Sequence, residues 1–145
     1  MTRRHDSLVP LTHDHHHALK NARRLRLAAD GSPAERVSVA RAFIAFFRDD
    51  SVRHFREEEE ELFPLVVGHP DAPMDGIARV LMEHVQMHAT CLDLERSAEA
   101  EDVSPDLMLQ TADLLKRHVR FEEDELFPAI ERLIPGELET LRLTD

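Results

Sequence analysis

One eleven-residue segment occurs twice in this chain of 145 residues. The copies, HFREEEEELFP at 54–64 and HVRFEEDELFP at 118–128, agree at 8 of 11 positions. Each copy places a histidine four residues before a glutamate: His54 precedes Glu58, and His118 precedes Glu122. With 3.6 residues per turn, residues four apart share one face of a helix. The repeat therefore predicts two helices that each present an imidazole beside a carboxylate, in a chain built from two related helical hairpins.

Apolar residues elsewhere also recur at helical spacing, as at Val37, Ala40 and Ile44, and not with the period of two typical of strands. Turns rich in proline and glycine divide the chain into four long segments. We expect helices near 8–29, 33–65, 74–99 and 105–133. Their short connections favour an all-α fold, an antiparallel up-down-up-down four-helix bundle. We expect a single domain over 1–145, with its bundle core at about 8–133 and a short C-terminal tail.

Composition excludes several classes of function. The formal net charge of −11 repels phosphate backbones and anionic lipid surfaces, so we expect no nucleic acid and no membrane partner. No run of about 18 apolar residues is present, and we expect a cytoplasmic protein.

Cys91 is the only cysteine, so a metal would be held by nitrogen and oxygen. Cys91 itself is expected to be a small buried hydrophobe rather than a redox sensor. Tyr and Trp are absent, which excludes a tyrosyl radical and a phenolate ligand.

The faces that carry these histidines are otherwise apolar. In the third predicted helix, His84 and His88 lie on a stripe with Leu81 and Cys91. The five glutamates at 57–61 sweep about 400° round a helix, so at least one must face inward, and Glu58 shares the face of His54.

The first predicted helix contains HDHHH at 13–17. Its apolar stripe of Leu11, Ala18 and Ala22 favours His15 as the inward residue, with His16 as the alternative. The pair Asp14-His15 also resembles Glu83-His84, so His15 aligns with His84 in the two hairpins. Burying so many imidazoles and carboxylates without a metal ion would be costly, so the pattern predicts a metal site. The other histidines are expected at the surface: His5, His13, His16, His17 and His69.

Taken together, His15, HFREE at 54–58, HVQMH at 84–88 and HVRFEE at 118–123 resemble the hemerythrin and HHE-domain family over nearly the whole chain. The resemblance implies an up-down four-helix bundle around a non-haem diiron centre, with two iron ions joined by an oxo or hydroxo bridge. It implies five terminal ligands and two bridging ligands. The terminal ligands are His15, His54, His84, His88 and His118, and the bridging ligands are Glu58 and Glu122. Oxygen-carrying members have an aspartate five residues after the last histidine, whereas spacing here favours Glu122 at four, with Glu123 as the alternative.

A count of coordination positions indicates what such a centre does. If each iron has about six positions, five imidazoles, two bridging carboxylates and one solvent bridge leave one position open. We therefore expect a protein that binds dioxygen, nitric oxide or peroxide for sensing, storage or detoxification, rather than a dedicated enzyme. The alternatives are a diiron oxidase or peroxidase, a protein that donates iron for cluster repair, and a structural bundle that binds adventitious zinc.

Overall fold

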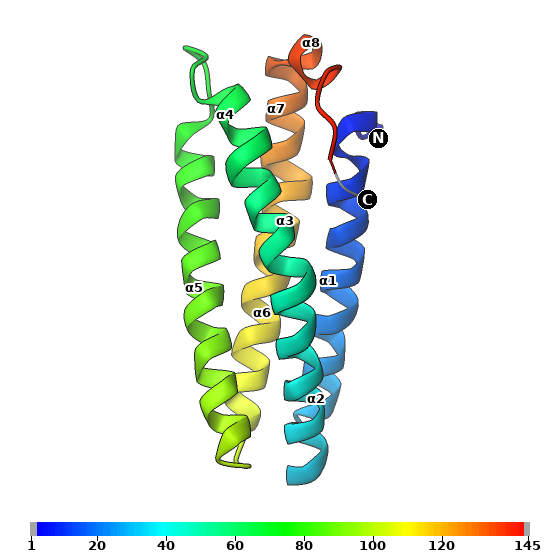
Figure 1. Ribbon diagram of the computed structural model, residues 1–145, viewed down its shortest axis with the longest axis vertical. Coiled ribbons are helices and arrows are strands. Elements are labelled where there is room, and N and C mark those ends of the chain that lie inside the picture. The colour runs from blue at the N-terminus through cyan, green and yellow to red at the C-terminus, as the bar shows by residue number, and fades with distance from the viewer. Residues whose placement is uncertain (1–2, 144–145) are drawn as a thin grey trace.

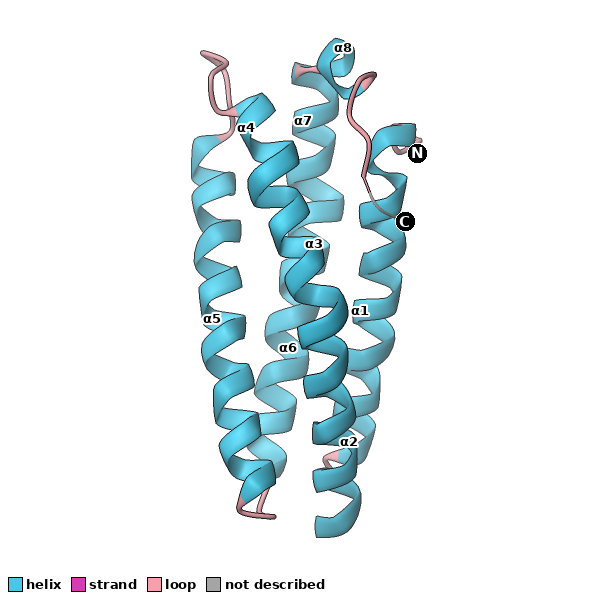
Figure 2. Cartoon of the chain, in the orientation of Figure 1, coloured by secondary structure: helices cyan, strands magenta, loops and turns pink. Residues whose placement is uncertain are grey.

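The structure is a computed structural model that describes residues 3–143, and these residues form helices and loops with no strand. Four long helical runs lie side by side, and the loops that join them lie at the two ends of the molecule (Figures 1 and 2). The first run is α1 (Val9–Ala28), which follows the short 3₁₀ turn η1 (Asp6–Leu8). The third is α5 (Met74–Glu99). No helix in the described part of the chain is both long enough and apolar enough to span a membrane.

The second and fourth runs are interrupted by π-helical turns. The second, over 33–66, consists of α2 (Pro33–Phe46), η2 (Phe47–Ser51), α3 (Val52–Glu57), η3 (Glu58–Leu62) and α4 (Phe63–Val66). The fourth, over 105–133, consists of α6 (Pro105–Phe121), η4 (Glu122–Leu126) and α7 (Phe127–Leu133). The four predicted helices are thus confirmed to within about one residue at each end, but the sequence pattern did not predict the π-helical turns.

The predicted helix starts at 33 and 105 are confirmed, and a serine caps each helix. The Ser32 hydroxyl accepts a hydrogen bond from the Glu35 backbone N–H at 3.1 Å, and the Ser104 hydroxyl accepts one from that of Leu107 at 3.1 Å. A proline follows each serine at the first helical position, where its missing N–H costs nothing.

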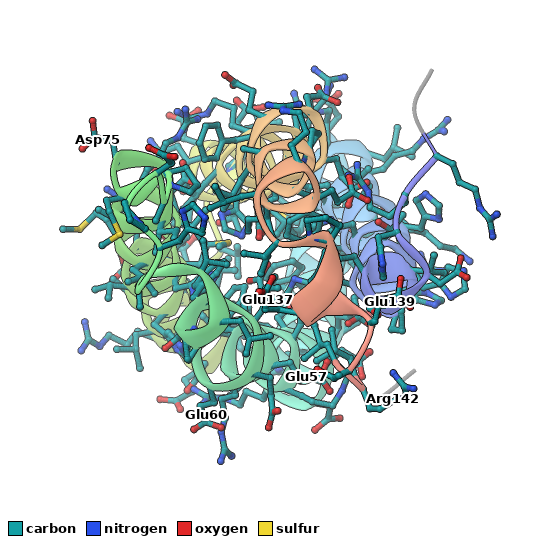
Figure 3. The ribbon with its side chains drawn as sticks, turned by 90° about the horizontal axis from the view of Figure 1, so that it is seen from above. Glu57, Glu60, Asp75, Glu137, Glu139 and Arg142 are labelled. Atoms are coloured by element: carbon teal, nitrogen blue, oxygen red, sulfur yellow. The ribbon has the colours of Figure 1, made fainter. Side chains whose placement is uncertain are left out.

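The C-terminal segment packs back on the bundle. The fourth run ends with α7 at Leu133, as expected, but a further short helix, α8 (Pro135–Leu138), follows. Leu138 and Leu141 are buried in the apolar core at that end. Viewed from above, α8 with Glu137 lies over the end of the bundle (Figure 3).

A buried polar layer separates two apolar clusters. One cluster includes Leu11, Leu62 and Phe127, and the other includes Ala18 and Cys91. Cys91 is 2% exposed, as expected for a small buried hydrophobe. Between the two clusters, each of the four runs contributes a histidine to the polar layer, and the second and fourth runs also contribute a glutamate.

Candidate metal centre

Six buried side chains form the polar layer. They come from α1, α3, η3, α5, α6 and η4, and they are His15, His54, Glu58, His84, His118 and Glu122. None is more than 4% exposed, and both glutamates are fully buried. Such a concentration of titratable groups in a core needs compensation, because a buried charge without a partner is strongly unfavourable.

The six side chains form two overlapping groups. In one group the atoms of His15 and His54 converge with Glu58 and Glu122, and in the other those of His84 and His118 converge with the same two glutamates. Within each group, one ligand atom per residue lies within 4.8 Å of all the others. The geometry therefore offers two adjacent positions, each surrounded by two imidazoles and two shared carboxylates.

The facing atoms approach each other but do not form hydrogen bonds. The closest approach joins His118 Nε2 and Glu122 Oε1 at 2.7 Å, and the longest joins His54 Nε2 and Glu58 Oε2 at 3.5 Å. All four Nε2 atoms and all four carboxylate oxygens of the layer are buried without a hydrogen-bond partner. Buried polar atoms are normally paired, and a pair of metal ions would satisfy all eight. The residues present therefore fit a two-metal site.

A second set of carboxylates holds the outer nitrogen of each imidazole. The Nδ1 atoms lie 2.7 to 2.9 Å from four acidic side chains, in the pairs His15–Glu123, His54–Asp14, His84–Glu59 and His118–Glu83. We call Asp14, Glu59, Glu83 and Glu123 the outer carboxylates. A carboxylate at Nδ1 places the imidazole proton there and leaves the Nε2 lone pair facing the centre, which is the arrangement of metal-binding histidines.

Three of the outer carboxylates are themselves held by a neighbour. Arg53 bonds Asp14 at 3.0 Å, Arg79 bonds Glu83 at 3.2 Å, and Glu123 accepts hydrogen bonds from Thr12 at 2.8 Å and Arg4 at 3.3 Å. The fourth, Glu59, is the most exposed, with 41% of its side chain accessible.

Three of the four outer carboxylates favour their charged forms, whereas burial raises the pKa of Glu59. Burial raises the pKa of Asp14, Glu83 and Glu123, but the hydrogen bond from the partner histidine leads the effects that outweigh burial. The net pKa of each lies below its ordinary value, so each is ionised at neutral pH.

Inside the layer, the pKa values diverge. Burial and the neighbouring Glu122 raise the pKa of Glu58 well above its ordinary value. Burial lowers the pKa of His118, but Glu122 and Glu83 outweigh burial and raise it to about 10. Burial and the nearby His118 lower the pKa of His84 to about 3. Without metal, His118 therefore retains its proton at neutral pH, and the neutral form of Glu58 is favoured.

The centre has approximate two-fold symmetry that follows the sequence repeat. The two glutamates are equivalent positions of the repeat, and each begins a π-helical turn, η3 or η4. Proline follows at 64 and 128, where it lacks an N–H and its ring crowds the carbonyl four residues earlier. A wider turn just before each proline relieves this crowding, and such turns are frequent at functional sites.

The structure brings together six of the seven predicted ligands. His88 lies outside both groups: its side chain is exposed, and its ring packs edge-on against Phe47 and Phe55, with centroids at 5.3 and 6.0 Å. The alternatives for two ligands lie elsewhere. His16 is exposed, and Glu123 bonds the outer nitrogen of His15.

Most of the histidines expected at the surface are found there. His13, His16 and His17 are exposed, whereas His5 and His69 are half-buried.

Sequence reasoning missed the role of the outer carboxylates. A signal for them is present, since Asp14 and Glu83 directly precede His15 and His84, and Glu59 and Glu123 directly follow the buried glutamates. Each of the four acids bonds a histidine of a different helical run, in the pairs given above. We call these the crossed pairs.

A buried layer of imidazoles and shared carboxylates within an all-helical chain defines a cation-binding helical domain. The profile of the hemerythrin HHE cation binding domain family matches residues 7–130, and the chain belongs to this family. No curated protein and no solved structure matches the chain.

Proposed function

We propose that this protein is an antiparallel up-down four-helix bundle that holds two iron ions and binds a small molecule at them. The observation that carries the proposal is the convergence of eight unpaired donor atoms, four nitrogens and four oxygens, in two groups that share Glu58 and Glu122. His15 and His54 bind one ion, His84 and His118 bind the other, and the two carboxylates bridge them.

The proposal rests on six ligands rather than seven, because His88 is exposed and outside both groups. Each ion then receives two nitrogens and two oxygens from the protein. A solvent bridge, oxo or hydroxo, supplies a fifth position, so an octahedral ion has one open position. With six ligands the vacancies number two, one on each ion, where the seven-ligand set leaves one.

The donor set favours iron. Imidazole and carboxylate suit iron, whereas the described metal-facing atoms include no thiolate. Bound iron supplies a redox-active Lewis acid for dioxygen, nitric oxide or peroxide. The chain's own residues do the rest: the outer carboxylates orient the imidazoles, and the two apolar clusters exclude bulk water from the layer.

Metal analysis and absorption spectroscopy test the proposal. Protein purified without added metal should contain about two iron atoms per chain, with a visible spectrum that changes on reduction and again on exposure to air or nitric oxide. Four protein donors also fill a tetrahedral zinc shell. Zinc as the native metal, or no metal, would overturn the proposal.

A second candidate function is a diiron oxidase or peroxidase. It is favoured by the outer carboxylates, whose negative charge stabilises ferric iron, and by vacancies on both ions. Consumption of peroxide over many turnovers with a supplied reductant supports this function. A single stoichiometric reaction per centre, or a stable reversible adduct with dioxygen, supports a binding protein instead.

A further inference from the structure

A cavity of about 230 Å³ opens beside the metal centre. It lies among α1, η2, α3 and α6, and three of the four histidines of the layer, His15, His54 and His118, line it. His17 and Asp50, both exposed, also line it and mark its opening to solvent. His84, Glu58 and Glu122 do not line it, so the cavity meets the polar layer at three of its imidazoles and from one side.

The π-helical turn η2 contributes Asp50 and Ser51 to the lining on this side. The turn η2, which joins α2 to α3, contacts α1. The turn ends at Ser51, and the small side chains of Ser51 and Ala18 line the cavity. The corresponding stretch of the other hairpin lies within α6, which has no such turn. The cavity is therefore a departure from the two-fold symmetry of the centre.

The cavity is larger than a diatomic ligand requires. A water molecule occupies about 30 Å³ of the liquid, so 230 Å³ corresponds to about eight groups of that size. A dioxygen or nitric oxide molecule would fill only a small part of it.

The lining has a polar side and an apolar side. Asp14, Ser51 and Arg53 supply polar groups, and Arg53 is already paired with Asp14 and Glu57 at 3.0 and 3.3 Å. The apolar lining is provided by Phe46, Phe55, Leu115 and Val119, of which all but Phe46 are buried. A hydrocarbon group placed against these four side chains leaves water, which favours binding.

We infer that the cavity binds the short hydrocarbon tail of an organic ligand whose oxygen head group binds the metal centre. This inference rests on the proposed function and narrows it: the ligand is an alkyl hydroperoxide or a short-chain carboxylate, not a diatomic gas. Alkyl hydroperoxides and short-chain carboxylates both have an oxygen head group and an alkyl tail. The experiment distinguishes these two ligand classes.

The first measurement is equilibrium binding of formate, acetate, propionate and butyrate to the iron-loaded protein, by competition with azide, whose ferric complex is coloured. Affinity should rise about fourfold for each added methylene until the cavity is full. The second measurement is the rate at which hydrogen peroxide and tert-butyl hydroperoxide oxidise the reduced protein. A faster reaction with the organic peroxide identifies it as the ligand class, and a tail preference in the carboxylate series alone identifies carboxylates.

The variant Ala18→Leu fills the cavity, and Ala22→Leu is its matched control one turn further along α1, where the buried Ala22 does not line the cavity. In Ala18→Leu the rise in affinity from formate to butyrate should disappear. The affinity for formate itself should change less than the affinity for butyrate. In the control the tail preference should persist. If Ala18→Leu folds poorly, Ser51→Leu replaces it, because Ser51 also lines the cavity.

A readout without metal accompanies the binding series. Ala22→Leu overpacks the core and should lower the Tm of the metal-free protein by several degrees, whereas Ala18→Leu fills an existing space and should lower it less or raise it. Equal losses of Tm, or no tail preference in either ligand series while iron and formate bind normally, overturn the cavity assignment and leave the proposed function intact. Failure to bind iron overturns both.

Discussion

Glu58 and Glu122 stand 64 residues apart in the sequence and occupy equivalent places in the structure. Each is fully buried, begins a π-helical turn, and faces one histidine of its own hairpin and one of the other. Glu58 approaches His54 and His84, and Glu122 approaches His118 and His15. Neither half of the centre is complete without the carboxylate of the other hairpin.

Replacing a shared carboxylate should remove both ions together. Glu58→Gln deletes an anionic ligand from both groups, so we expect the iron content to fall from about two per chain to near zero, with no stable one-iron form. Glu60→Gln is the control, because Glu60 is exposed at the rim of the bundle (Figure 3). A Glu58→Gln protein that retains one tightly bound iron per chain would contradict the sharing of this carboxylate.

His88 and His84 should differ sharply in their effect on metal binding, although they lie four residues apart on one helix. His88→Ala should leave about two iron atoms per chain, because the His88 ring contacts Phe47 and Phe55 rather than the shared glutamates. His84→Ala should lose the ion held by His84 and His118. Metal analysis of the two variants shows whether His88 is a ligand. Loss of iron in His88→Ala would mean that the centre has seven protein ligands, including His88.

The outer carboxylates should strengthen metal binding without touching the metal. Asp14→Asn retains a hydrogen-bonding side chain near His54 but removes its charge, and we expect metal affinity to fall about 10- to 100-fold. Glu83→Gln, the equivalent change beside His118, should have a similar effect. Competition with a chelator measures the affinity, and Glu60→Gln is again the control. Wild-type affinity in both variants would show that the Nδ1 contacts do not support the centre.

Metal binding should release protons, because the metal-free layer retains a proton at His118. The pKa of His118 is about 10, so this imidazole is protonated at pH 7, and the pKa of Glu58 is also raised well above its ordinary value. A metal ion at His118 replaces this proton, so at least one proton leaves as the centre fills, and affinity rises with pH. Calorimetry in buffers of different ionisation enthalpy measures the release. Binding that is independent of pH between 6 and 8 would contradict these protonation states.

Helical periodicity was sufficient to predict the four helices and the inward faces of most of the polar layer. The apolar stripe of α1 favoured His15 over His16, and the structure confirms that His15 is buried and His16 exposed. The expected inward position of Glu58 is confirmed as well, since Glu58 is fully buried while Glu59, Glu60 and Glu61 are exposed. These inferences succeeded because each depends only on rotation about one helix axis.

Features that depend on two helices at once could not be predicted in this way. The placement of His88 is an example: four residues advance it about 40° beyond His84, and whether that reaches the centre depends on which neighbouring side chains fill the space. Here Phe47 and Phe55 fill it. The crossed pairs of the outer carboxylates likewise arise from packing between runs.

The crossed contacts bear on how this centre arose. The first hairpin, α1 to α4, contains one copy of every kind of group in the layer: a leading acid and histidine, then a histidine, a bridging glutamate and its following acid. The second hairpin contains the same set in the same order. Two identical copies of one such hairpin, associating as a homodimer, would therefore build the complete centre, and duplication followed by fusion would yield the present chain. The turn η2 and the cavity that it lines would then be features acquired by one half alone.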